Sequence, residues 1–498
     1  MMKTILKIIL CLLIVSLKGY AQNLHPKRLP NIIYIYADDL GYAETGPYGQ
    51  KKIRTPNLDK LAKEGMKFTQ HYTATPVCAP ARCMLMTGKH GGHSYIRGNY
   101  EMGGFPDSLE GGQMPLPERT FTIPVMLKKA GYVSALTGKW GLGMNNSTGS
   151  PLKQGFDYYY GYLDQKQAHN FYPSHLWEND LKVSLDNPYI NVHRPLDSTN
   201  ATDKDFEYYK GRTYSQDMIT KKAIQFINKQ GKKPFFLYMP YNIPHVSLQV
   251  PDAYTNKYVG QFKEQPYYGQ QGYAPAKYPY STYAAMITYL DEQIGIIMAE
   301  IKKLGLDNDT IIMFSSDNGT TFNGGVNAKF FNSVDGMKGL KMDVFEGGIR
   351  EPFIARWPGK IPANTTSDFI SVQFDMMATF AEIAGVETNN TDGISLLPTL
   401  LGKNEKQQQR EYIYWEYPEK GGQLAIRMGN WKGVRLNLWK DLNNPWMIFN
   451  LKNDRNETED LSSQHPELAK RFDEIVKKEH QVSHINEWEF LESKMKKN

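Results

Sequence analysis

Two apolar segments that each end in acidic residues constrain the fold of this chain most strongly. Residues 31–39 read NIIYIYADD, and residues 311–319 read IIMFSSDNG. Both segments are short and rich in β-branched and aromatic side chains, which is typical of strands buried on both faces. Such strands belong to parallel sheets covered by helices. In open parallel sheets the ligand crevice lies outside the carboxyl ends of the strands, so we expect the acids to meet at one crevice.

The polar groups at these two strand ends suit a metal ion. They are three carboxylates and one amide, Asp38, Asp39, Asp317 and Asn318. Three carboxylates held close together repel one another, and some stay protonated unless a cation neutralises them. An oxygen-only ligand set favours one hard divalent ion, Ca²⁺ or alternatively Mg²⁺, over zinc. Each pair alone also fits a helix cap or a turn.

Two further strand-like segments place basic groups at the same rim. Residues 132–140 read YVSALTGKW and lead to Lys139. Residues 234–245 read PFFLYMPYNIPH and end at His245. Both segments have the apolar and aromatic composition of buried strands. We therefore expect a lysine and a histidine beside the acids.

The cysteines point to a third feature of this rim. The chain has three, of which Cys11 lies in the N-terminal leader, and Cys78 and Cys83 lie in TPVCAPARCMLMTG. Their spacing allows a local disulfide or two buried thiols. Proline near the first helical position and Gly88 after the last turn predict a short helix that begins at Cys78.

The residue four positions after Cys78 is Arg82, which a helix would place on the same face. A tetrahedral oxyanion beside Cys78 would then meet both the helix N-terminus and a guanidinium group.

The stretch Cys-Ala-Pro-Ala-Arg at 78–82 resembles the Cys-x-Pro-x-Arg signature of type I sulfatases, the formylglycine-dependent branch of the alkaline-phosphatase-like superfamily. Five further motifs follow in the family's order: ADD at 37–39, TGKW at 137–140, PH at 244–245, SDNG at 316–319 and KMDVFEGGIREP at 341–352. The resemblance extends from about residue 30 to about residue 480. It is strongest to bacterial carbohydrate sulfatases.

The resemblance implies a function for each of these groups. Cys78 would be oxidised by a formylglycine-generating enzyme to formylglycine (3-oxoalanine), whose hydrate attacks the sulfur of a sulfate ester. The metal ligands would be Asp38, Asp39, Asp317, Asn318 and the modified Cys78. The sulfate oxygens would be neutralised by Arg82, Lys139 and Lys341. His245 would protonate the leaving oxygen.

One position departs from the family's pattern. The usual Gly-Lys-Trp-His-Leu-Gly reads GKWGLG at 138–143, so Gly141 replaces the expected histidine. His169 is the candidate replacement, although a packing role in a loop also fits. His93 and Arg97, which follow the Cys78 helix in GKHGGHSYIRGN, are further candidates for substrate contact.

The N-terminus indicates export. Residues 1–22, MMKTILKIILCLLIVSLKGYAQ, have the basic start and short apolar run of a cleaved signal peptide. Its removal lowers the net charge from +6 to about +3, with no clustered basic run, so nucleic acid is not the expected partner. No other apolar run reaches the length of a membrane helix. We therefore expect a periplasmic or secreted protein without a stable membrane anchor.

The rest of the sequence predicts two domains. Alternating strand and helix signals up to about residue 400 indicate a doubly wound, mostly parallel α/β sheet of the alkaline-phosphatase-like type, with a catalytic domain over 23–402. Residues 403–498 predict a smaller α+β domain with an antiparallel sheet. Its helix over 466–478 carries apolar side chains at helical spacing, among them Phe472 and Ile475.

These features favour sulfate ester hydrolysis, with sulfated carbohydrate as the substrate. The expected activity is exo-acting removal of O-sulfate from galactose or N-acetylgalactosamine residues of sulfated glycans. Three alternatives stay open at this point: a general arylsulfatase, a phosphatase or phosphodiesterase of the same superfamily, and an inactive protein that binds sulfated glycans. The phosphatase relatives carry Ser or Thr as nucleophile, so Cys78 argues for sulfate.

Overall fold

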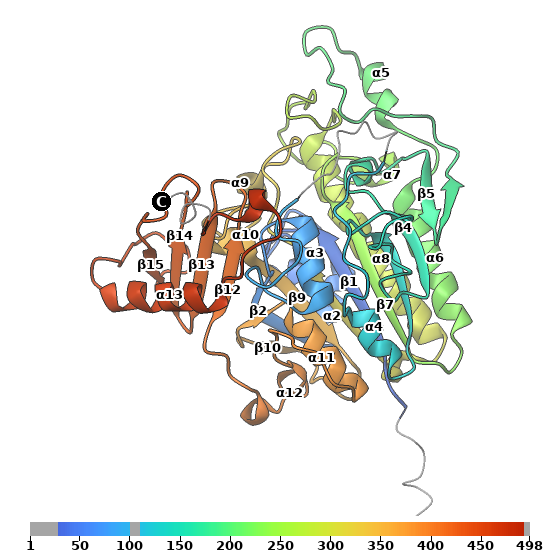
Figure 1. The fold of residues 1–498 in the computed structure, drawn as a ribbon. Helices are drawn as coiled ribbons and strands as arrows, with labels where there is room; N and C mark the ends of the chain where they lie inside the picture. The colour runs from blue at the N-terminus through green and yellow to red at the C-terminus, as the bar shows by residue number, and fades with distance from the viewer. Residues whose placement is uncertain (1–27, 100–109, 493–498) are drawn as a thin grey trace, which may run out of the picture.

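The computed structural model describes residues 28–99 and 110–492, so the predicted signal peptide over 1–22 lies outside the described residues. Within them, eleven strands form one mostly parallel sheet in the order β10-β2-β9-β8-β1-β7-β3-β4-β5-β6, with β11 beside β2 (Figure 1). The strands are β1 (Asn31–Asp38), β2 (Met66–Tyr72), β3 (Val133–Lys139), β4 (Tyr158–Tyr162), β5 (His175–Glu178), β6 (Leu181–Ser184), β7 (Phe235–Pro244), β8 (Thr310–Ser316), β9 (Arg350–Arg356), β10 (Thr365–Ser367) and β11 (Ser371–Val372).

The four segments expected to deliver the polar rim are neighbours at the centre of this sheet. β1 pairs in parallel with β8 on one side and β7 on the other, and β7 pairs in parallel with β3. Every residue of β1 is buried. Alternate side chains of β1 enter two different cores, Ile33 and Ile35 on one face and Ile32 and Tyr34 on the other. The prediction of a doubly wound sheet is therefore confirmed.

Helices cover both faces. One core includes side chains of α2 (Pro56–Lys63), α6 (Ser215–Lys229) and α8 (Pro279–Lys303), and the other includes those of α3 (Cys78–Thr87), α4 (Ile123–Lys128) and α11 (Asp375–Ala384). The connections contain short helices, α5 (Asp203–Phe206), α7 (Asp252–Thr255), α9 (Ala328–Phe331), α10 (Glu346–Ile349) and α12 (Leu397–Leu400), and 3₁₀ turns, η1 (Gly46–Tyr48), η2 (Gln167–His169), η3 (Glu207–Tyr209), η4 (Asp307–Asp309), η5 (Asn404–Lys406) and η6 (Asn486–Trp488). No helix in the part of the chain that the structure describes is both long and apolar enough to cross a membrane.

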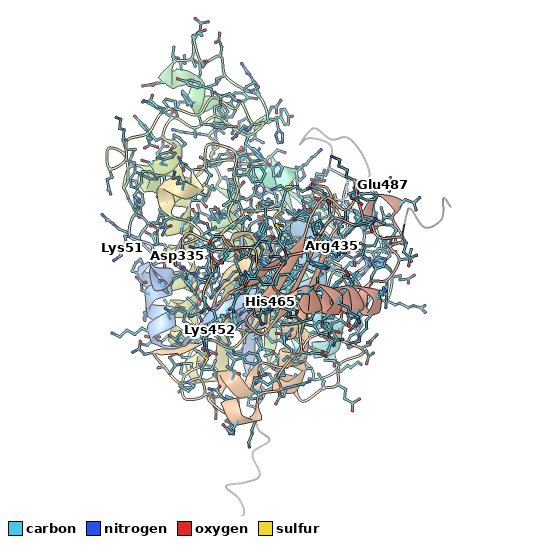
Figure 2. All side chains as sticks on the ribbon, turned by 90° about the vertical axis from the view of Figure 1, so that its left-hand side faces the viewer. Lys51, Asp335, Arg435, Lys452, His465 and Glu487 are labelled. Atoms are coloured by element: carbon cyan, nitrogen blue, oxygen red, sulfur yellow. The ribbon has the colours of Figure 1, made fainter. Side chains whose placement is uncertain are left out.

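The C-terminal part forms a second, antiparallel sheet, as predicted. Its order is β12 (Ile413–Tyr417), β13 (Gln423–Met428), β14 (Trp431–Arg435) and β15 (Met447–Asn450). The helix α13 (Pro466–Glu479) packs on this sheet through the buried Phe472 and Ile475. Figure 2 views the molecule from this side and shows α13 in front, with His465 at the end where the helix begins. The domain boundary at residues 402 and 403 stays a prediction.

The small sheet packs against the edge of the large sheet that carries β2 and β9 (Figure 1). Trp415 of β12, Tyr72 of β2 and Met84 of α3 share one buried core. Trp415 Nε1 also donates a hydrogen bond to the backbone carbonyl of Thr73 at 2.8 Å. The C-terminal sheet therefore supports the segment that leads into α3.

Candidate active site

The strand ends bring the four predicted oxygen ligands together. Asp38 is the last residue of β1, and Asp317 and Asn318 directly follow β8. Asp39 has a left-handed backbone with φ of 64°, and its N–H donates to Asp317 Oδ1 at 3.1 Å. Asn318 Nδ2 donates to Asp39 Oδ1 at 2.7 Å. The two strand ends are thus held together by the same side chains that were predicted to bind a metal.

Cys78 is the first residue of α3, and its side chain lies beside these acids. Its Sγ lies 3.2 Å from Asp38 Oδ1 and 3.7 Å from Asp39 Oδ1. Burial, and then the charge of Asp38, raise the pKa of the Cys78 thiol well above its usual value. Cys78 and Cys83 are both buried free thiols, so of the two options left by their spacing the structure selects the one without a disulfide.

Three basic side chains lie among the acids. Arg82 Nη2 is 2.8 Å from Asp317 Oδ2 and 3.5 Å from Asp38 Oδ2. Lys139 Nζ, at the end of β3, is 2.7 Å from Asp38 Oδ2. Lys341 Nζ is 2.8 Å from the carboxylate of Asp39. Positive and negative groups therefore lie close together beside Cys78. Of the three cations, Lys139 and Lys341 line the cavity at Cys78, whereas Arg82 is fully buried and does not.

The acids do not all carry the same charge in this arrangement. Burial raises the pKa of Asp38, but Lys139 and Arg82 outweigh this effect and hold the pKa well below its usual value. Burial, followed by the negative charge of Asp38, raises the pKa of Asp317 to about 8. One of the acids therefore keeps its proton near neutral pH, as expected for clustered carboxylates without a neutralising divalent ion.

A cavity of about 180 Å³ opens at Cys78. Its lining consists of Val77, Cys78, Asn99, Lys139, Gln165, His169, His245, Tyr273, Thr321, Phe322, Asn323, Lys341 and Met342. The groups that carry charge or reactivity, Cys78, Lys139 and His245, are buried at its inner end, whereas Asn99 and Phe322 are exposed at its mouth. The cavity is therefore cationic inside and neutral at its entrance.

Two histidines stack inside the cavity. The rings of His169 and His245 lie 4.9 Å apart at an interplanar angle of 8°. His245 Nε2 is 3.6 Å from Asp39 Oδ2. Burial, then the charge of Lys341, lower the pKa of His245 to about 4, and burial followed by His245 lowers the pKa of His169 well below its usual value. His169 Nδ1 is buried without a hydrogen-bond partner among the described residues.

At position 141, where the family pattern has a histidine, the structure leaves no room for a side chain. Gly141 adopts a left-handed backbone with φ of 75°, and a Cβ added there would lie 2.9 Å from Gln165 Cγ. The Gln165 side chain therefore fills the space that a side chain at position 141 would enter.

The structure does not bring His93 and Arg97 to this cavity. His93 Nδ1 lies 3.0 Å from Asp392 Oδ2, and Arg97 Nη1 lies 2.8 Å from Glu416 Oε1. Neither residue is part of the cavity lining. Both side chains are held by acids outside the cavity lining, so the structure gives no support to their predicted contact with substrate, which stays a prediction.

Several lining residues were not predicted from the sequence. They are Asn99, Gln165, Tyr273, Phe322 and Asn323, and all lie in loops. Tyr273 lies in a Tyr-rich loop, but no spacing pattern distinguishes it from the neighbouring tyrosines.

Comparison with known protein families and with curated proteins identifies sulfatases as relatives of this chain. Residues 30–386 match the family described as sulfatase, and residues 340–483 match the family described as N-sulphoglucosamine sulphohydrolase, C-terminal. The N-acetylgalactosamine-6-sulfatase of Canis lupus familiaris is 31% identical over 412 residues, which cover 78% of this chain and 69% of the relative. The arylsulfatase A of Bos taurus is 31% identical over 429 residues, with 83% and 76% covered.

Solved structures share the fold. The crystal structure of Ps i-CgsB in complex with k-i-k-neocarrahexaose superposes with a TM-score of 0.72 at 30% identity, covering 91% of this chain and 94% of that one. A structure from work on glycosaminoglycan metabolism by Bacteroides thetaiotaomicron has a TM-score of 0.70 at 26% identity, with 91% and 99% covered. Because the sulfatase family matches well over half of the chain, the chain belongs to the type I sulfatases of the alkaline-phosphatase-like superfamily and is a sulfuric ester hydrolase.

Proposed function

We propose that this protein is an exo-acting carbohydrate sulfatase that removes O-sulfate from galactose or N-acetylgalactosamine residues at the ends of sulfated glycans. The observation that carries the proposal is the cavity of about 180 Å³ at Cys78, with Lys139 and Lys341 in its lining. Typical ligand pockets hold roughly 300–1,000 Å³, so this one has room for a sulfate group and part of one ring. The sulfatase relatives named for N-acetylgalactosamine support the choice of sugar.

The donor set fits a divalent cation. Three acids and three bases surround the reactive position: Asp38, Asp39, Asp317, Arg82, Lys139 and Lys341. A divalent cation would replace the proton that Asp317 keeps and would add positive charge beside Lys139 and Lys341 at the inner end of the cavity. Asn318 Oδ1 is a buried acceptor without a hydrogen-bond partner among the described residues. We infer that Asp38, Asp39, Asp317 and Asn318 hold one Ca²⁺ or Mg²⁺ together with the modified residue 78.

Each group of the cavity then has a separate task. The bound ion would supply positive charge at the transferred sulfate group. Cys78 oxidised to formylglycine would supply the attacking oxygen as an aldehyde hydrate. Lys139, Lys341 and Arg82 would bind the sulfate oxygens, and fixed donors of this kind contribute about 3–4 kcal/mol each to transition-state stabilisation.

His245 would protonate the leaving sugar oxygen. Its Nδ1 donates a hydrogen bond to the carbonyl of Val246, which leaves Nε2 as the atom that exchanges a proton. Burial, and then the charge of Lys341, favour the neutral ring of His245. A sulfate ester in the cavity would oppose them by placing negative charge beside that ring.

Maturation requires a partner enzyme and, with the predicted signal peptide, a route of export. We infer that a formylglycine-generating enzyme oxidises Cys78 and that the mature protein is periplasmic or secreted. Because Cys78 is buried at the start of α3, we infer that this oxidation precedes folding.

A panel of substrates tests the proposed function. We expect purified, matured protein to release sulfate from O-sulfated galactose or N-acetylgalactosamine, and to release it faster from chain ends than from internal residues. Faster hydrolysis of 4-nitrophenyl sulfate than of every sulfated sugar would favour the arylsulfatase alternative. Membership of the sulfatase family favours sulfate over phosphate, and no sulfate release from any substrate by matured protein would favour the inactive binding protein. Preferential release of phosphate from matched esters would contradict the proposal.

A further inference from the structure

The mouth of the catalytic cavity differs in chemistry from its inner end. Phe322 lines the cavity, yet 47% of its surface is exposed. The preceding residue, Thr321, is buried, and its hydroxyl donates to Asn323 Oδ1 at 2.7 Å. This hydrogen bond fixes the turn that presents the ring. Single exposed apolar side chains are common on protein surfaces, but this ring also lines the catalytic cavity, where a bound ligand would cover it.

The groups around the ring are polar and oriented by other elements. Lys420, from the turn between β12 and β13, places its Nζ 5.9 Å from the centre of the Phe322 ring and 2.6 Å from Asp343 Oδ1. Asn99 Oδ1 accepts hydrogen bonds from the Ala79 backbone and from a glutamine side chain. Among the described residues, neither Asn99 Nδ2 nor Asn323 Nδ2 donates a hydrogen bond, and both residues line the cavity together with Phe322.

We propose that Phe322 is a stacking platform for the sugar ring that carries the sulfate, and that it selects galacto-configured sugars. This inference rests on the proposed function. In such sugars the axial 4-oxygen projects from one face, which leaves C3–H, C4–H and C5–H together on the other face as an apolar patch. An aromatic ring covers such a patch, while Asn99 and Asn323 donate to ring hydroxyls. With the sulfate at the lysines and the sugar ring against Phe322, the sugar is held in one position at the mouth of the cavity.

Kinetics of ring-removing and ring-keeping variants test the platform. The substrates are the sulfated galactoside that the wild-type protein hydrolyses fastest and its glucose epimer. Phe322→Leu keeps an apolar side chain but loses the ring, and we expect KM for the galactoside to rise about tenfold with little change in kcat. The preference of Phe322→Leu for the galactoside over its epimer should also fall. Phe322→Tyr, which keeps a ring, should have the KM and the epimer preference of the wild-type protein.

Two controls separate stacking from damage to the site. Inorganic sulfate binds only at the cationic end, so its inhibition constant should be the same in wild type and Phe322→Leu. Tyr189→Leu removes an exposed aromatic ring outside the cavity lining and should leave KM unchanged. An unchanged KM and epimer preference in Phe322→Leu would overturn the platform while the proposed function stands. Failure of the wild-type protein to hydrolyse any sulfated sugar would instead overturn the proposed function.

Discussion

At the scale of single residues, Lys139 is the more deeply buried of the two lysines that line the cavity. It is buried, and its Nζ contacts Asp38 Oδ2 at 2.7 Å. We predict that Lys139→Met lowers kcat/KM for a sulfate ester by about 100- to 1,000-fold, because a donor fixed at the developing charge is lost. Lys232→Met, at an exposed position, is the matched control. A loss of less than about fivefold in steady-state kinetics would remove Lys139 from the sulfate site.

His169 is the residue proposed to replace the histidine that is absent at position 141. It lines the cavity and stacks on His245, and its buried Nδ1 has no hydrogen-bond partner among the described residues. We predict that His169→Ala slows turnover far more than it weakens substrate binding, because the lost group moves a proton and does not hold the sugar. His465→Ala, at a half-buried position outside the cavity lining, serves as control. Unchanged kcat in single-turnover and steady-state measurements would refute the assignment.

Gly141 is confined by its own backbone and by Gln165. An L-residue in a left-handed conformation costs roughly 1–2 kcal/mol, and a side chain at 141 also collides with Gln165 Cγ. We predict that Gly141→His lowers the thermal unfolding midpoint, and that Gly141→His with Gln165→Ala recovers part of the loss. A single variant as stable as wild type in calorimetry would show that Gln165 is not packed as described.

At the scale of elements, the end of α13 is attached to the small sheet through a histidine. His480 Nδ1 lies 3.0 Å from Glu416 Oε2, and Nε2 lies 3.4 Å from Glu489 Oε1. Burial lowers the pKa of His480, but the two carboxylates raise it further, to about 9. Since the pKa in the folded state exceeds the unfolded value near 6.5, the stabilisation is complete below pH 6.5 and is lost as the pH rises through 9.

This linkage gives a prediction for stability against pH. The two pKa values of His480, 6.5 and about 9, mark the pH range over which this stabilisation is lost. The fall in thermal midpoint between pH 6.5 and 9.5 should therefore be smaller in His480→Asn than in wild type. His465→Asn should behave like wild type. Identical pH profiles for wild type and His480→Asn would contradict the ion pair.

The elements also show what could be predicted from the sequence. The strand ends were predictable, because β1 and β8 each contain a short run of β-branched and aromatic side chains shortly before an acid, and this pattern needs no long-range information. The placement of His93 was not, because the chain after α3 turns toward Asp392 and the end of α13, far away in sequence. The residues at the cavity mouth could not be predicted either, because Asn99 and Phe322 come from loops that only the tertiary fold brings together.

At the scale of the whole molecule, one ion would connect the ends of the two strands at the centre of the large sheet. Binding to the folded state alone adds about 2.7 kcal/mol to the unfolding free energy when the free ion is at 100 times its Kd. We predict that Ca²⁺ or Mg²⁺ raises the thermal midpoint of chelator-treated protein. Asp317→Asn should lose most of this rise, whereas Asp186→Asn, at an exposed loop, should keep it. An equal rise in wild type and Asp317→Asn would place the ion elsewhere.

The most direct test of the account concerns residue 78. Protein would be produced with and without a formylglycine-generating enzyme, the fraction of residue 78 present as the aldehyde would be measured by peptide mass spectrometry, and sulfate release from the best substrate would be measured on the same samples. We predict that the rate of release is proportional to the aldehyde fraction and is absent from Cys78→Ala. Equal rates from fully converted protein and from protein in which Cys78 is an intact thiol would contradict the account.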